Sequence, residues 1–499
     1  MYSFSMAFEP FLILICSAGA VLGIIWGAMP GLSTTMAMAL LVGLSYGMAT
    51  DIAIIFMLGV FTGSVFGGAI SATLINIPGT PDAVPTQLAG FPLAKKGQGG
   101  LVLGTSITAS MIGNWVGILL LVSCVPFILD IALKFASWEV ALLALWGVAI
   151  SGTLTAGETP LKGWISGWLG LLIALVGREV VHGYERFTFG NPELLLGIPY
   201  IPVLIGLFGL TEIFDAISEP SPYVIPQKIG RVFPPFKLII KYWKSIIRSS
   251  FVGMLTGVIP GCGANVATFV SYGVGERFTK KKFSKGDLEG VICSEVANNA
   301  NIGGALLPSL VLGIPGSAPT AAFIAALSLH GIILGPTIDV EHPGLLYFVY
   351  GGLIVANIAM YLSAFALIKP SVKLFSLPRE LLLPMITILC VIGSFAWKMA
   401  MFDIYLMFGF GLFGYIMRKT GFPIGPMVLG VILGKMMDEN LRRGMQVFEG
   451  DVIGQILSRP VGLVLIIIVI LTFVSGIYRK KGERRLGKKV NAVKNSVLK

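Results

Sequence analysis

Long apolar stretches without a charged side chain follow one another along most of the sequence. A membrane-spanning helix needs about 20 apolar residues. Stretches of sufficient length occur at 10–50, 52–81, 97–129, 140–157, 194–211, 249–275, 296–338, 343–368 and 460–478. Shorter ones, which suit tilted, re-entrant or broken helices, occur at 163–177, 381–397, 404–417 and 420–434. Because 10–50 and 296–338 have room for two passes each, we expect an all-α polytopic membrane protein with about 12 transmembrane helices.

The composition supports a membrane protein and explains the net charge. Of the 499 residues 55% are hydrophobic and 12% charged, with a mean hydropathy of +0.87, whereas soluble domains carry about 25% charged residues. The net charge of +11 might suggest a nucleic-acid binder, but residues 479–499 hold nine Lys and Arg against one acid. This tail is expected to lie in the cytoplasm, near anionic lipid headgroups.

The motifs of common membrane enzymes do not occur. Five cysteines show no CxxC pattern, and the three histidines, for which we expect surface roles, form no HExxH. Neither a GxSxG nor a Walker A motif is present, which argues against hydrolases and ATPases. The first 28 residues lack a basic segment, so they are interpreted as a retained membrane segment rather than a signal peptide. We therefore expect no enzyme, no transition metal and no cofactor.

Two Pro-Gly interruptions recur in the same order in both halves of the chain. GAMPG (27–31) matches GVIPG (257–261), and GGAISATLINIPGTP (67–81) matches GGALLPSLVLGIPGSAP (303–319). The predicted organisation is an N-terminal half at 1–220 with breaks at 30–31 and 78–79, a basic cytoplasmic connector at 221–248, a C-terminal half at 249–478 with breaks at 260–261 and 315–316, and the tail at 479–499.

The positions of the charges predict that the two copies are inverted. In the first copy Lys95 and Lys96 follow the second break, and the linker between the breaks carries only Asp51. In the second copy the linker 276–285 is basic, and acids follow the break. Basic loops lie in the cytoplasm, so the two copies cross the membrane in opposite directions. Inverted repeats with broken helices are typical of secondary transporters.

Polar residues surround the four breaks. Backbone exposed at membrane depth is tolerated where it lines a cavity or is covered by protein, and facing helix N-termini can hold a carboxylate. The candidate substrate-binding residues are Gly31, Ser33, Thr34, Thr35, Asn76, Pro78, Gly79, Thr80, Gly261, Gly263, Asn265, Pro315, Gly316, Ser317 and Thr320. The alternative is that these breaks are kinks whose helix ends are capped.

A second polar cluster precedes the long uncharged stretch of the second half. Its candidates for binding Na⁺ are Glu295, Asn298, Asn299, Asn301 and Ser271, because oxygen ligands in broken helices suit this ion. Hydrogen bonding between helices is the alternative role. Asp82, Glu212 and Asp215 are lesser candidates.

Several long motifs resemble the large membrane subunit of the tripartite tricarboxylate transporter family, from about residue 23 to about residue 434. They are GAMPGLSTT (27–35), NIPGTP (76–81), T-x-x-x-G-F-P-L-x-x-K-G (86–97), RFTFG (186–190), GLFGLTE (206–212), GVIPGCGANVATFVSYGVGERF (257–278), KGDLEGV (285–291), EVANNA (295–300) and LGIPGSAPTA (312–321).

This resemblance implies a permease of the bacterial cytoplasmic membrane, driven by an ion gradient and moving in an elevator-like way. The implied partners are a small four-helix membrane subunit and a periplasmic solute-binding protein, and the implied substrates are citrate-like tricarboxylates or other small organic acids. Na⁺ is the expected coupling ion, with H⁺ as the alternative. A passive anion channel, a membrane enzyme and an assembly scaffold are the competing interpretations.

Three positions depart from the pattern of that family. Ala89 stands where the family usually has Asp, Ser294 where it usually has Pro, and Glu179 follows Arg178 where Gly-x-Asp is frequent. The loss of a carboxylate at position 89 bears on substrate identity, whereas the Pro-Gly breaks are intact.

Overall fold

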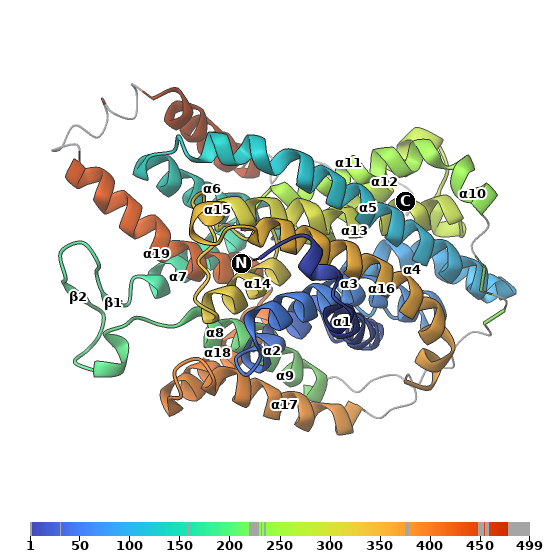
Figure 1. Ribbon diagram of the computed structural model, residues 1–499, viewed down its shortest axis with the longest axis horizontal. Coiled ribbons are helices and arrows are strands. Elements are labelled where there is room, and N and C mark those ends of the chain that lie inside the picture. The colour runs from blue at the N-terminus through green and yellow to red at the C-terminus, as the bar shows by residue number, and fades with distance from the viewer. Residues whose placement is uncertain are drawn as a thin grey trace, which may run out of the picture. The chain divides into compact units, whose positions relative to one another are not determined.

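The computed structural model describes residues 2–29, 31–156, 159–218, 229–230, 232–233, 236–374, 379–447, 454 and 459–477. These residues are almost entirely helical (Figure 1). The described strands are β1 (Gly177–Arg178) and β2 (Glu185–Arg186), which pair antiparallel with Gly177 opposite Arg186. The expected all-α fold class is therefore confirmed. Contacts group the chain into two compact units, one formed by 1–133 and 201–415 and the other by 134–200 and 416–499.

The first unit contains both copies of the repeat. The helices of the first copy are α1 (Pro10–Ala28), α2 (Thr34–Ser45), α3 (Thr50–Ile75), the 3₁₀ turn η2 (Pro81–Ala83), α4 (Val84–Leu93), the π turn η3 (Ala94–Gln98) and α5 (Gly99–Ala132). Those of the second copy are α11 (Trp243–Val258), α12 (Gly263–Thr279), η6 (Phe283–Lys285), α13 (Leu288–Leu312), α14 (Ala318–Leu329), α15 (Ile338–Glu341) and α16 (Leu345–Leu374).

The remaining elements connect these copies or belong to the second unit. Between the copies lie α8 (Tyr200–Leu204), the π turn η5 (Ile205–Leu210), α9 (Thr211–Ser218) and α10 (Phe236–Lys241), and after them come α17 (Arg379–Phe395) and α18 (Met401–Lys419). The second unit holds α6 (Ser137–Thr155), α7 (Pro160–Ala174), the β1–β2 hairpin, α19 (Ile424–Val447) and a final helix at Pro460–Ile477.

Eight helices in the described part of the chain are long and apolar enough to span a membrane, which supports a multi-pass membrane protein. They are Pro10–Ala28, Thr50–Ile75, Pro81–Ala132, Ser137–Thr155, Tyr200–Ser218, Leu345–Pro370, Met401–Lys419 and Pro460–Ile477. The apolar helices α2 and α14 have 12 residues each, or about 18 Å, roughly half the apolar thickness of a bilayer. The breaks thus shorten some elements below a full span, and the count of about 12 stays a prediction.

The two copies make the same close contacts between their glycines. A Cβ at Gly67 would lie 2.6 Å from Ile24 O of α1, and one at Gly304 would lie 2.5 Å from Met254 O of α11. A Cβ at Gly67 would also meet Gly27 of α1, three residues after Ile24, and one at Gly304 would meet Gly257 of α11, three residues after Met254. These contacts make Gly67 and Gly304 equivalent positions of the two copies. Matching the two Gly-Gly pairs in the sequence would instead make Gly67 equivalent to Gly303. Only glycine allows helix axes to approach this closely.

The copies also exchange their neighbours. Helix α5 of the first copy packs against α13 of the second, and α16 of the second copy packs against α1 and α3 of the first. In the same way α2 packs against α14, while α12 contacts α4 and η2. Each copy therefore completes the core of the other, within one compact unit.

The ends of the copies meet crosswise as well. The loop before α13 reaches the end of α4, where a Cβ at Gly286 would lie 3.2 Å from Pro92 Cβ. The start of α3 meets the end of α14, since Thr50 Oγ1 lies 3.4 Å from His330 Nδ1. The linker of each copy thus adjoins the segment that follows the second break of the other.

The compact units differ from the predicted division of the chain. Both repeat copies lie in one unit, and residues 134–200 join the end of the chain in the other. The predicted halves therefore stay a prediction. Residues 221–228, 231 and 234–235 of the predicted connector and the basic tail at 479–499 lie outside the described residues.

Candidate functional site

The first break of the first copy separates α1 from α2. Pro30 lies outside the described residues, and Gly31 has a φ of 86°, a left-handed conformation that favours glycine. Ser33 caps α2, because its hydroxyl accepts a hydrogen bond of 3.1 Å from Met36 N. Thr34 is buried and Thr35 half-buried at the start of the same helix. The break is thus a sharp turn followed by a capped helix.

The second break of the first copy lies between α3 and η2. Asn76 ends α3 in a left-handed conformation with a φ of 59°, and the Gln87 amide donates to its backbone carbonyl at 2.7 Å. The next residues are half-buried at Pro78 and fully buried at Gly79. Gly79 N donates to Gly68 O at 3.4 Å, so this tip lies directly on α3.

The two breaks of the second copy are hydrogen-bonded to each other. Gly261, with a φ of 74°, donates its N–H to Gly316 O at 3.0 Å. Gly263, also left-handed, begins α12, and a Cβ there would lie 3.7 Å from Ser317 Cβ. Candidate residues of the first and the second break of this copy therefore lie next to each other.

Residues after the second break cap α14. Ser317 and Thr320 form a capping box, in which each side chain bonds the backbone N–H of the other at 3.4 and 3.0 Å. Pro315 is buried before this cap. On α12 Asn265 is exposed. Caps satisfy some of the N–H donors, so the kink interpretation and the anion-site interpretation both fit these ends.

Glu295 lies in a pocket lined with hydroxyl groups. Its side chain is fully buried in α13, and Thr86 of α4 donates a short hydrogen bond to its Oε1. Ser110 of α5 donates to Oε2 at 2.9 Å, and Ser294 lies 2.8 Å from the Thr86 hydroxyl. The carboxylate of the second copy is therefore held by two helices of the first.

A second buried carboxylate follows the tip of the first copy. Asp82 in η2 is 5% exposed and lies beside the side chains of Thr80 and Asn298, both 1% exposed. Among the described residues, Thr80 Oγ1, Asp82 Oδ2 and Asn298 Oδ1 are buried without a hydrogen-bond partner. The Asn298 amide donates to Val65 O of α3 at 3.3 Å.

The other predicted ion ligands bond to backbone. Asn299 donates to Glu295 O at 3.0 Å within α13, and Asn301 donates to Gly253 O of α11 at 3.1 Å. Ser271 of α12 donates to Cys293 O at 2.8 Å. The last two bonds join neighbouring helices, in line with the alternative role. The lesser candidates Glu212 and Asp215 lie on α9, away from the breaks in sequence.

Two of the three positions that depart from the family pattern, Ala89 and Ser294, lie on α4 and α13, which pack against each other. Ala89 is completely buried in an apolar cluster with Val102, Phe283 and Val291, so an apolar side chain replaces the expected carboxylate there. A Cβ at Gly290 would lie 2.9 Å from Ala89 Cβ, which leaves little room for a longer side chain. Ser294 instead adds a hydroxyl to the environment of Glu295.

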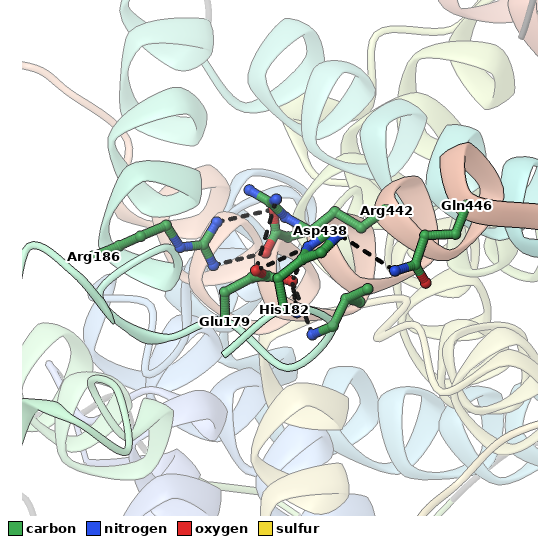
Figure 2. A network of polar contacts seen from close by, with 7 residues as sticks. Glu179, His182, Arg186, Asp438, Arg442 and Gln446 are labelled. Carbon is green, nitrogen blue, oxygen red and sulfur yellow. Dashed lines mark hydrogen bonds and ion pairs between the residues drawn. The ribbon is translucent and has the colours of Figure 1, made fainter. Parts of the chain in front are cut away.

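The third departing position, Glu179, belongs to an ionic network in the second unit (Figure 2). Burial opposes ionisation of Glu179, but hydrogen bonds from the backbone N–H groups of His182 and Val181 and the charge of Arg442 outweigh it. The pKa of Glu179 consequently lies below its ordinary value. The carboxylate therefore fixes the turn between β1 and β2.

The same network attaches the hairpin to α19. Figure 2 shows Arg186 and Arg442 converging on Asp438. Arg186 makes two hydrogen bonds to the Asp438 carboxylate at 2.7 and 3.2 Å, and Arg442 makes one at 3.0 Å. The RFTFG motif thereby begins with an arginine whose contacts are structural.

Sequence reasoning missed the hydroxyl partners of Glu295. Thr86 appears in the sequence analysis only as the first residue of the motif at 86–97, and Ser110 of α5 is not among the candidates. Ser106 and Ser110 are four residues apart and therefore share one face of α5, and both are completely buried. This spacing of two polar residues in an apolar helix was the signal that could have identified them.

Comparison with known proteins identifies the family of this chain. The model of the "Tripartite tricarboxylate transporter TctA family" matches residues 13–429. The chain belongs to the tripartite tricarboxylate transporter TctA family. Among relatives of this TctA-family chain, an "uncharacterized 52.8 kDa protein in TAR-I ttuC' 3'region" of Agrobacterium vitis is 32% identical over 460 residues, 90% of each chain. An "uncharacterized protein in TAR-II ttuC' 3'region" of the same species is 33% identical over 237 residues, covering 46% of this chain and 98% of the relative. No solved structure matches.

Proposed function

We propose that this chain is the large permease subunit of a binding-protein-dependent secondary transporter in the bacterial cytoplasmic membrane. It takes up a small carboxylate, such as citrate or a related organic acid, and Na⁺ drives the uptake. The periplasmic solute-binding protein delivers the carboxylate, and the small four-helix membrane subunit completes the complex. The observation that carries this proposal is the family match over residues 13–429, which includes all four breaks.

The geometry at the breaks supports a carboxylate as substrate. Tips that meet through Gly261 and Gly316 bring the starts of α12 and α14 close together. The positive ends of two helix dipoles then face one region, where an anion is stabilised without a basic side chain. Hydroxyls of residues such as Ser33 and Ser317 add donors for carboxylate oxygens.

The crosswise contacts support two inverted copies and an elevator-like movement. Basic residues follow α4 in the first copy and precede α13 in the second, and these two segments adjoin each other at Gly286. One side of the membrane then holds both basic segments, as the positive-inside bias requires. In this proposal the C-terminus is cytoplasmic, and a domain carrying the tips moves the carboxylate across the membrane.

Uptake into proteoliposomes tests the proposed function. The chain, the small membrane subunit and the loaded binding protein should accumulate radioactive carboxylate when an inward Na⁺ gradient is imposed. Ser33→Trp and Ser317→Trp should abolish uptake, because an indole would fill the region between the tips. Ser123→Trp, at an exposed position of α5, is the matched control and should transport normally. Uptake at full rate without the binding protein, or in both tip variants, would contradict the proposal.

A further inference from the structure

Thr80 and Asp82 at the tip of the first copy lie beside Asn298 of α13 in the second, and all three are buried polar side chains. We propose that Thr80 Oγ1, Asp82 Oδ2 and Asn298 Oδ1 bind the coupling cation, Na⁺. This inference rests on the proposed function. The expected ligand set around Glu295 included Asn298, and it named Asp82 only as a lesser candidate. Asp82 becomes the charged ligand.

Burial makes these three atoms costly to leave without a partner. Nearly all buried polar atoms in proteins have a hydrogen-bond partner, and an exception needs an explanation such as an ion. Thr80, Asp82 and Asn298 are at least 95% buried, and in the described part of the chain these three oxygens have none. An uncompensated carboxylate in a membrane domain is especially costly. A cation would satisfy all three oxygens at once and neutralise the carboxylate.

The chemistry of the ligands favours a monovalent, hard cation. The three atoms are a carboxylate, an amide and a hydroxyl oxygen, which are ligands for ions such as Na⁺ rather than for transition metals. The described residues include no cluster of three or more His, Cys, Asp or Glu side chains. Glu295 is near enough for its charge to interact with Asp82, but both of its oxygens already accept hydroxyl hydrogen bonds. One carboxylate therefore matches one positive charge.

Local packing holds the ligands in place. Thr80 lies over Gly68 of α3, where a Cβ would collide with its hydroxyl, so glycine is required for this approach. The Asn298 amide is anchored by its bond to Val65 O, and among the described residues its Oδ1 has no hydrogen-bond partner. Since Thr80 and Asp82 belong to the first copy and Asn298 to the second, a bound cation would fasten the tip to α13. This gives Na⁺ a direct effect on the substrate tip.

Binding of Na⁺ to the purified chain, without any carboxylate, tests the inference. We expect the Tm to rise with NaCl relative to choline chloride at equal ionic strength, because a ligand that binds only the folded state stabilises it. Asp82→Asn should abolish both this rise and the binding of radioactive Na⁺. Thr80→Val and Asn298→Ala, which remove neutral ligands, should lower the affinity by about 10-fold or more. Asp51→Asn is the matched control and should bind as the wild type does.

Three results would overturn the inference: no Na⁺-specific stabilisation of the wild type, unchanged Na⁺ binding by Asp82→Asn, or a stabilisation that follows pH instead of Na⁺. Uptake measurements separate this failure from that of the proposed function. If carboxylate uptake needs Na⁺ but Asp82→Asn still binds the ion normally, the assigned site is wrong and the function stands. If Na⁺ binding depends on Asp82 but no gradient drives uptake, the site stands and the function is wrong.

Discussion

Replacing Gly316 by alanine tests whether the two breaks of the second copy act as one unit. A Cβ at this position would lie 2.5 Å from Gly257 O and 2.6 Å from Ala305 Cα. Ordinary van der Waals contact begins at 3.4 Å, and both neighbours are backbone, so they cannot rotate away. The tip must shift by roughly 1 Å, and a shift of this size at a functional site costs about 100-fold in rate. Gly261 would move with it, because it donates its N–H to Gly316 O.

The assay is uptake into proteoliposomes, normalised to the amount of inserted protein. Overpacking also costs about 1–3 kcal/mol of stability, so the Tm in detergent is measured in parallel. Gly273→Ala in α12 is the control, since a Cβ there meets nothing within 4 Å, and we expect it to behave as the wild type. If Gly316→Ala inserts normally and transports at the wild-type rate, the close contact has no role in transport.

Two further predictions concern ionic contacts of the second unit. Arg459→Ala should lower the unfolding free energy by about 1–3 kcal/mol, below the ~3–5 expected for breaking a fully buried pair, because Arg459 is partly exposed. In this variant Glu139 loses its ion pair with Arg459 Nε at 2.8 Å but keeps the hydrogen bond from Ala136 N–H. Thermal denaturation of Arg459→Ala, compared with Arg459→Lys, measures the effect. Because the pKa of Glu179 is depressed, its contribution is present above its ordinary pKa of 4.5 and is lost as pH falls through the lower folded value. The protection of amides 177–190 against hydrogen exchange, relative to their intrinsic rates at each pH, should fall over that range in the wild type. Glu179→Gln should lack this pH dependence, and an unchanged pH dependence in Glu179→Gln would contradict the assignment.

The breaks could be predicted because their residue types determine the local backbone. Gly31 and Gly261 adopt left-handed conformations that other residues rarely reach, and Ser33 and Ser317 cap the helices that follow. These properties depend on a few neighbouring residues. A Pro-Gly pair followed by a hydroxyl therefore carries its own structural meaning, even in a single sequence.

The partners of the buried carboxylates could not be predicted in the same way. Thr86 and Ser110 reach Glu295 from positions 209 and 185 residues away in sequence. Their contacts depend on the packing of α4 and α5 against α13 of the other copy, which no local pattern specifies. Asn299 and Asn301 became ion-binding candidates because a polar residue in a membrane helix is visible in the sequence. The direction in which such a side chain points is not visible there. The position of Asp82 beside Asn298 could not be predicted either, because Asn298 belongs to the other copy.

The paired scaffold also carries an asymmetric chemistry, which bears on how transport could be coupled. With Gly67 paired to Gly304, Glu295 and Asn298 of α13 correspond to Leu58 and Phe61 of α3. Leu58 makes an apolar contact with α16, since a Cβ at Gly352 would lie 2.8 Å from Leu58 Cδ1. Glu295, the equivalent residue of the second copy, instead accepts a hydrogen bond from Ser110 of α5. Both copies carry matching breaks, but at these two aligned positions only α13 has a charged or amide side chain. An ion would then act on the tip of the first copy alone, so that one tip responds to the ion and the other does not.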